Sequence, residues 1–171
     1  MTTQFTSQQS ADHYLTAIES LVTQIIQYGG FELKANVRRC GAPELDPNPA
    51  YILVDFEGPD CDLLLEKNAA LLDALEYVVL KAVRVDEDLY GRISFDCRDW
   101  RQVRAEELKL TALMAARQAV ETGSPFHMTP MSSRERRIVH LALKDDTAVK
   151  TMSEGAGPSR KVVIYPSTSP S

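Results

Sequence analysis

Four basic side chains follow one another at helical spacing in residues 131–144, which begin with the sequence MSSRERRIVHLAL. At 100° per residue, positions i, i+4 and i+8 share one face of a helix, so Arg136, His140 and Lys144 form a stripe with Arg137 beside it. Guanidinium groups donate forked hydrogen bonds to phosphate oxygens, and a neutral imidazole can hydrogen-bond to a base or stack on it. The stripe therefore predicts contact with a nucleic acid.

The spacing alone also fits a more ordinary interpretation. Charges on an amphipathic helix usually form a solvated face, and Glu135, Asp145 or Asp146 could pair with the arginines. Like charges at i,i+4 cost an isolated helix only about 0.2–0.5 kcal/mol per pair. The residues of the stripe leave both interpretations open.

The charge of the chain is divided unevenly along its length. The whole chain of 171 residues has a formal net charge of -5. Residues 1–97 contain 7 basic and 16 acidic side chains, a net charge of -9, whereas residues 98–171 contain 12 and 8, a net charge of +4. Such asymmetry indicates a polyanion-binding surface that is confined to the C-terminal part.

The elements that must position the basic stripe can be predicted from local signals. Ser132 and Glu135 form a capping-box pattern after Pro130, which predicts that the helix begins there. A helix over residues 99–121 and a short extended piece, PFHM, precede it; two strands, TAVKTMS and KVVIYP, follow it with EGAGPSR as their turn. Arg160 and Lys161 flank the last strand, where they either extend the basic face or belong to an ordinary solvated turn.

The N-terminal part of the chain predicts a second unit. A polar stretch of about ten residues precedes a helix in ADHYLTAIESLVTQIIQYGG, which the glycine pair ends. Two strands follow, FELKANVRR and AYILVDFEG, with CGAPELDPNP as the loop between them. A short helical turn, a break near Lys67 and Asn68, a longer helix and the strand RISFDC complete the order α-β-β-α-α-β.

Several other classes of function find no support in the sequence. The three cysteines, Cys40, Cys61 and Cys97, form no C-x-x-C pair, and no leader or membrane-spanning run is present, which favours a soluble cytoplasmic protein. No nucleophile stands beside an identifiable base, so we expect no enzyme, cofactor or small-molecule substrate. The acidic run at residues 86–88 is more typical of a solvated turn than of a metal site, and Trp100 of packing than of base stacking.

The motifs around the stripe resemble a known family. Arg136 to His140 carries the Arg-x-x-x-His signature of the R-three-H domain, a single-stranded nucleic-acid-binding module. Further matching motifs are TG at Thr122–Gly123, PM at Pro130–Met131, T-x-S-x-G at Thr151–Gly155 and R-x-V-V-I-x-P at Arg160–Pro166. Together they resemble the C-terminal half of the bacterial Jag proteins, also called KhpB or SpoIIIJ-associated proteins. The resemblance covers roughly residues 12–166.

The resemblance implies an α+β architecture. A type II KH domain would occupy residues 11–98 and a small α/β R-three-H domain residues 99–166, between a flexible N-terminus at residues 1–10 and a disordered tail at residues 167–171. It implies single-stranded RNA or DNA as the ligand of Arg136, Arg137, His140, Lys144, Arg160 and Lys161. It also implies a small KH-domain protein as a partner, no membrane insertion, and roles in RNA regulation and cell envelope growth or division.

One loop departs from the family pattern. The four positions of the family's GXXG loop are Glu66, Lys67, Asn68 and Ala69 in this chain, so Glu66 and Ala69 stand where the two glycines belong. That loop clamps a nucleic-acid backbone, so the chain must approach phosphate closely and often adopts dihedral angles that favour glycine. A carboxylate at Glu66 repels phosphate. We therefore expect this KH domain to have lost most of its RNA grip, with a protein-protein scaffold as the alternative function.

Overall fold

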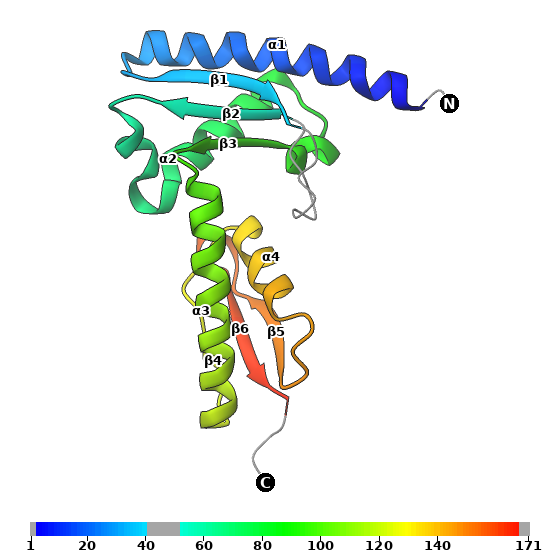
Figure 1. The fold of residues 1–171 in the computed structure, drawn as a ribbon, viewed down its shortest axis with the longest axis vertical. Helices are drawn as coiled ribbons and strands as arrows, with labels where there is room; N and C mark the ends of the chain where they lie inside the picture. Colours follow the sequence, from blue (N-terminus) through cyan, green and yellow to red (C-terminus); the bar gives the residue numbers. More distant parts are fainter. Residues whose placement is uncertain (1–2, 41–51, 168–171) are drawn as a thin grey trace. The chain divides into compact units, whose positions relative to one another are not determined.

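The computed structural model describes residues 3–40 and 52–167 (Figure 1). The chain divides into two compact units: unit 1 ends at Trp100, and unit 2 begins at Arg101. The predicted loop CGAPELDPNP and the predicted tail lie almost wholly outside the described residues. None of the helices in the described ranges is long and apolar enough to cross a membrane.

Unit 1 contains the elements of the N-terminal part in the predicted order. They are α1 (Thr3–Gly29), β1 (Lys34–Arg39), β2 (Ile52–Glu57), α2 (Cys61–Val83), a 3-10 turn (Glu87–Arg92) and β3 (Ile93–Cys97). The sheet has the order β1-β2-β3, with β1 antiparallel and β3 parallel to β2. The flexible N-terminus predicted at residues 1–10 is wrong from Thr3 onward, because α1 already begins there. Once a helix is nucleated, each added residue gains a backbone hydrogen bond even where the sequence is polar.

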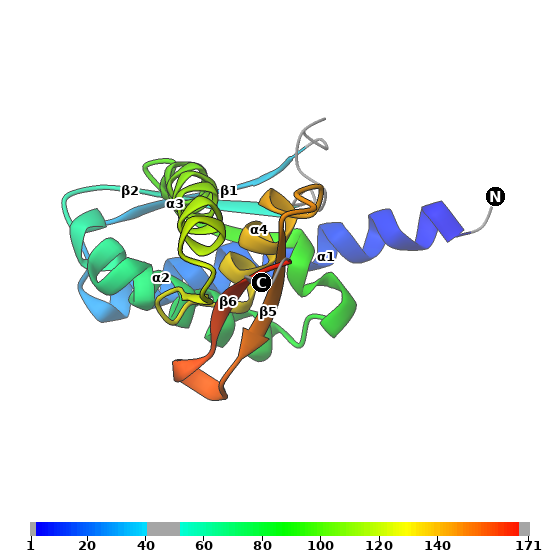
Figure 2. The same cartoon turned by 90° about the horizontal axis from the view of Figure 1, so that it is seen from below.

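The sheet of unit 1 is buried on one face by α1 and α2. Both helices lie on the same side of the sheet (Figure 2). Side chains alternate along β2 and β3, so every second one points into the core. Phe56 and Phe95 are fully buried, and their ring centroids lie 5.8 Å apart. Ile18 of α1 and Leu72 of α2 belong to the same core.

The helix α2 is broken where the sequence predicts it. Glu66 has an extended backbone, and the next three residues, Lys67, Asn68 and Ala69, all have left-handed backbone angles with φ between 51° and 60°. Each such residue other than glycine costs roughly 1–2 kcal/mol, less for asparagine. The chain therefore retains the backbone of a glycine-type loop without its glycines, and the fully buried Ala69 fixes the loop to the core.

Unit 2 is built around the helix α3 (Trp100–Thr122). The remaining elements are β4 (Phe126–His127), α4 (Ser133–Ala142), β5 (Val149–Glu154), a 3-10 turn (Gly157–Ser159) and β6 (Lys161–Pro166). The strands form an antiparallel sheet in the order β4-β6-β5. Its core joins α3, α4 and the sheet through Leu108, Val139 and Ile164. These elements agree with the predicted ones to within about two residues; α4 ends at Ala142, two residues before the predicted end.

Candidate nucleic-acid interface

The capping box predicted at the start of α4 is confirmed. The hydroxyl of Ser132 accepts a hydrogen bond from the Glu135 backbone N–H at 3.3 Å, and Glu135 Oε2 accepts one from the Ser132 backbone N–H at 2.8 Å. Two of the free donors at the helix start are thereby satisfied. The box fixes where α4 begins and so determines which of its residues face the solvent.

Glu135 also forms an ion pair that the sequence did not predict. Arg104 of α3 donates from Nε to Glu135 Oε1 at 2.8 Å, and the two side chains are only 16% and 18% exposed. Burial by itself would raise the pKa of Glu135, but the hydrogen bonds from Arg104 and Ser132 outweigh it and hold that pKa below its ordinary value. The residues are 31 positions apart, so no local pattern reveals the pair.

His140 is held through both of its ring nitrogens. Nδ1 lies 2.6 Å from the Thr151 hydroxyl and Nε2 lies 2.9 Å from the Ser153 hydroxyl. Thr151 and Ser153 are alternate residues of β5 and therefore face the same side. Burial, and then the positive charge of Arg136, lower the pKa of His140, so the ring is neutral at pH 7. The histidine joins α4 to β5, and this explains two residues of the T-x-S-x-G motif.

The basic residues of the stripe differ in their accessibility. Arg137 is exposed, whereas Arg136 is half-buried and its Nε has no hydrogen-bond partner among the described residues. Lys144 is exposed but lies beyond the end of α4, in the turn that follows, with Nζ 3.9 Å from Asp145 Oδ2. The i+8 place predicted for Lys144 on the helix is therefore wrong.

The start of β6 is tied to the segment before α4. The backbone N–H of Met131 donates to the carbonyl oxygen of Arg160 at 3.1 Å. The side chain of Arg160 is exposed, and Lys161 is half-buried at the first position of β6. Gly155 in the preceding turn has φ +86°, and a Cβ there would lie 3.0 Å from the Ser159 carbonyl oxygen. Glycine is needed at that position to bring Arg160 back toward α4.

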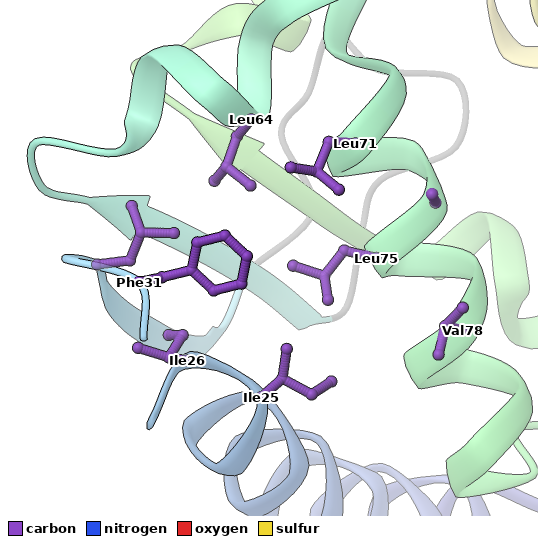
Figure 3. A pocket seen from close by; sticks show the side chains of 9 residues that line it. Ile25, Ile26, Phe31, Leu64, Leu71, Leu75 and Val78 are labelled. Carbon is purple, nitrogen blue, oxygen red and sulfur yellow. The ribbon is translucent and has the colours of Figure 1, made fainter. Parts of the chain in front are cut away.

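Unit 1 offers a different kind of surface. Between α1 and α2 lies a hollow of about 310 Å³, lined by apolar side chains that include Ile26, Phe31, Leu71, Leu75 and Val78 (Figure 3). The residues of the GXXG-like loop that precede Ala69 are exposed. The hollow has no polar group with which to read a base edge.

Side chains of the acidic run at residues 86–88, and Trp100, make contacts within unit 1. Asp86 accepts a hydrogen bond from the Tyr14 hydroxyl at 3.1 Å, and Glu87 pairs with Lys81 at 3.3 Å. No group of three potential metal ligands occurs in the residues that the structure describes. Trp100 is half-buried against the core of unit 1, as the packing interpretation predicted.

Comparison with known proteins identifies the module that carries the stripe. Residues 106–166, from α3 to the end of β6, match the R-three-H domain family. This segment is an R-three-H domain. The resemblance to the Jag and KhpB proteins is confirmed, whereas the type II KH domain stays a prediction because the matched family covers only the C-terminal part.

Relatives from several bacteria align with 63–71% of the chain. The chain is 35% identical over 111 residues to "RNA-binding protein KhpB" of Clostridium symbiosum, covering 65% of this chain and 50% of the relative. It is 32% identical to the Bacillus subtilis protein of that name, covering 63% and 52%, and 30% identical to that of Lactiplantibacillus plantarum, covering 71% and 38%. The chain thus spans about half the length, or less, of these relatives.

The contacts of His140 predict a pH dependence of stability. The pKa of His140 in the folded chain lies below 6.5, so the unfolded chain takes up the proton first as the pH falls. We expect unit 2 to keep its full stability above pH 6.5 and to lose stability as the pH falls from there toward the folded pKa of His140.

Amide hydrogen exchange of β5 and β6 at several pH values measures this loss. His140→Gln should flatten the dependence, whereas His127→Gln, at an exposed position of β4, should leave it unchanged. An unaltered slope in His140→Gln would show that other groups cause it.

Proposed function

We propose that this chain is a non-enzymatic, cytoplasmic RNA-binding protein that grips single-stranded RNA through its R-three-H domain. One observation carries the proposal. Glu135, the single acid of α4, is withdrawn into the ion pair with Arg104, while Arg137 is exposed and makes no ion pair within the described ranges. Arg137 therefore keeps its charge for phosphate. The relatives named "RNA-binding protein KhpB" support RNA as the ligand.

Each predicted residue has a role that its surroundings support. Arg137 and the outer guanidinium nitrogens of Arg136 contact phosphates. His140 holds β5 against α4 and reaches a base by exchanging one of its hydroxyl partners. The basic surface continues along the RNA backbone through Arg160, Lys161 and Lys144.

The salt dependence of binding tests the proposal. Fluorescence anisotropy with a labelled single-stranded RNA should give an affinity that falls with salt by about 0.7 in log K per log salt for each phosphate neutralised. Arg137→Ala should reduce this slope by about 0.7 and weaken binding severalfold at low salt. The matched control is Lys150→Ala, because Lys150 is exposed on β5 at a position that alternates with Thr151 and Ser153.

Two results would contradict binding through the R-three-H domain. The first is an affinity for RNA that does not change with salt, or no binding at all. The second is an equal loss in Arg137→Ala and Lys150→Ala, which would indicate a diffuse charge effect. Single-stranded DNA of the same sequence, measured in parallel, shows whether the 2′-hydroxyl contributes.

For unit 1 we propose a type II KH fold that serves as a protein-protein scaffold, with a small KH-domain protein as its partner. The α-β-β-α-α-β order and the left-handed loop at residues 67–69 support the KH assignment. The carboxylate of Glu66 and the net charge of -9 over residues 1–97 oppose RNA binding by this unit. The apolar hollow between α1 and α2 favours a protein partner.

Restoring the glycines distinguishes a lost RNA site from a unit that never had one. The double variant Glu66→Gly with Ala69→Gly should raise the affinity for RNA severalfold, because the repelling charge is removed and phosphate can approach the backbone more closely. Glu66→Gln is the matched control, since it removes the charge and keeps a side chain. An unchanged affinity in the double variant would count against the degenerate-loop explanation.

A further inference from the structure

The helix α3 has two apolar faces, of which the fold covers one. Five small or aliphatic residues on the first face are buried in unit 2: Leu108, Ala112, Ala115, Ala116 and Ala119. Five larger apolar residues lie elsewhere on the helix and are 42–74% exposed: Val103, Leu110, Leu113, Met114 and Val120. An isolated apolar residue on a surface is ordinary, but five on one helix mark an interaction surface.

Four of these five exposed residues, all except Met114, lie at the spacing of a coiled-coil seam. Steps of 3, 4, 3, 4 and 3 residues define what we call the α3 seam: Val103, Glu106, Leu110, Leu113, Arg117 and Val120. At 1.5 Å per residue the seam is about 25 Å long. A heptad-like stripe of this kind is suited to packing against another helix.

The α3 seam is complementary to the α3 seam of a second copy of the chain that runs antiparallel to it. About a two-fold axis between residues 111 and 112, Leu110 lies opposite Leu113 of a second copy, and Val103 opposite Val120. The same operation places Glu106 opposite Arg117, so the acid and the base meet twice. A parallel pair would instead place glutamate against glutamate and arginine against arginine, which is repulsive.

We propose that α3 is a self-association element, in which the α3 seams of two copies of this chain pack antiparallel. The charges of the seam are available for this contact. Arg117 is exposed and makes no ion pair in the part of the chain that the structure describes. Glu106 Oε1 accepts from Lys109 at 2.9 Å, but these side chains are 63% and 49% exposed, and such a surface pair holds the carboxylate only weakly. A carboxylate can accept from Lys109 and from a second arginine together.

Sedimentation equilibrium of the full chain tests the pairing. A seam of this length is a small interface, so we expect self-association at protein concentrations on the order of 100 µM. Glu106→Arg and Arg117→Glu should each weaken it about tenfold or more, because each replaces two attractions with two repulsions. Gln118→Glu, at an exposed position outside the α3 seam, is the control and should leave it unchanged within about twofold.

Recombining the charges makes the test specific for the antiparallel arrangement. The double variant Glu106→Arg with Arg117→Glu should associate as the unaltered chain does, since both pairs are restored with reversed sign. In a parallel arrangement the double variant would stay repulsive. The substituted residues are all exposed, so the buried face of α3 stays intact. Circular dichroism of each variant checks that it is folded.

Three results would overturn the proposal. The first is an unaltered chain that remains monomeric up to about 500 µM. The others are single variants that associate like the unaltered chain, and a double variant that does not recover self-association. Since α4 carries the proposed RNA contacts, the RNA affinity of the R-three-H domain and the self-association can fail independently.

Discussion

Replacing Glu135 with alanine is expected to lower the free energy of unfolding of unit 2 by about 3 kcal/mol. The substitution removes the more buried of the two carboxylate partners of Arg104, whose side chain is 16% exposed, and leaves its Nε–H without an acceptor, which is costly in such a place. It also breaks the capping box, so that the backbone N–H of Ser132 loses its acceptor. The two losses arise from one side chain and add within the same unit.

The measurement must report on unit 2 alone. Amide hydrogen exchange of β5 and β6, followed by NMR, gives the opening free energy of that sheet. Glu107→Ala is the matched control, because Glu107 also pairs with Arg104 at 2.8 Å but is 60% exposed. Its loss should cost less than about 1 kcal/mol. Equal effects of the two substitutions would mean that the buried pair contributes nothing beyond a surface pair.

The Glu135 contacts also set a pH window of their own. The pKa of Glu135 lies below 4.5 in the folded chain, so its contribution is present above pH 4.5 and is lost as the pH falls through the folded pKa. Glu135→Ala should lack this acid loss. The His140 contribution is lost in a separate window that begins at pH 6.5, so the two groups can be resolved in one titration.

The elements near the stripe could be predicted because their signals are local. Ser132 and Glu135 of the capping box are three positions apart, and the apolar run in KVVIYP is contained in one strand. The break in α2 was predicted near Lys67 and Asn68 from the interrupted apolar pattern. Such signals survive in a single sequence because each depends on neighbours within one or two turns of the chain.

The parts of the site that escaped prediction depend on residues far apart. Arg104 and Glu135 meet across 31 positions, and His140 reaches Ser153 across 13. A weak signal for the second contact existed, since hydroxyl residues alternate in β5 and so share a face. For the first contact, no feature of the sequence distinguishes Arg104 from the other arginines of α3. The helical start at Thr3 could not be predicted, because the polar residues before Ala11 carry no apolar periodicity.

Replacing Gly58 with alanine is expected to destabilise unit 1 by about 3 kcal/mol. Gly58 follows β2 and has φ +139°, a value that residues with a Cβ rarely adopt. An added Cβ would overlap with the carbonyl oxygen of Glu32 and lie 3.1 Å from the Cα of Leu33. Both neighbours are backbone atoms, so no rotation of a side chain relieves the clash. The segment is also held by the Glu32 backbone N–H, which donates to Asp60 at 2.8 Å.

Gly30→Ala provides the control for backbone angle without steric conflict. Gly30 has φ +69° and no atom within 4 Å of an added Cβ, so its substitution should cost only about 1–2 kcal/mol. The fluorescence of Trp100, which packs on the core of unit 1, follows unfolding of this unit in urea. A cost at Gly58 no larger than that at Gly30 would contradict the close approach to Glu32.

The same variant tests which unit holds the RNA. If the R-three-H domain carries the grip, Gly58→Ala should keep the salt slope of RNA binding within experimental error while unit 1 loses stability. Glu135→Ala should show the reverse, a weaker RNA affinity at temperatures where unit 2 begins to open and an unchanged Trp100 transition. A fall in RNA affinity that follows the unfolding of unit 1 would instead assign part of the binding to the loop at residues 66–69, in which residues 67–69 have left-handed backbone angles.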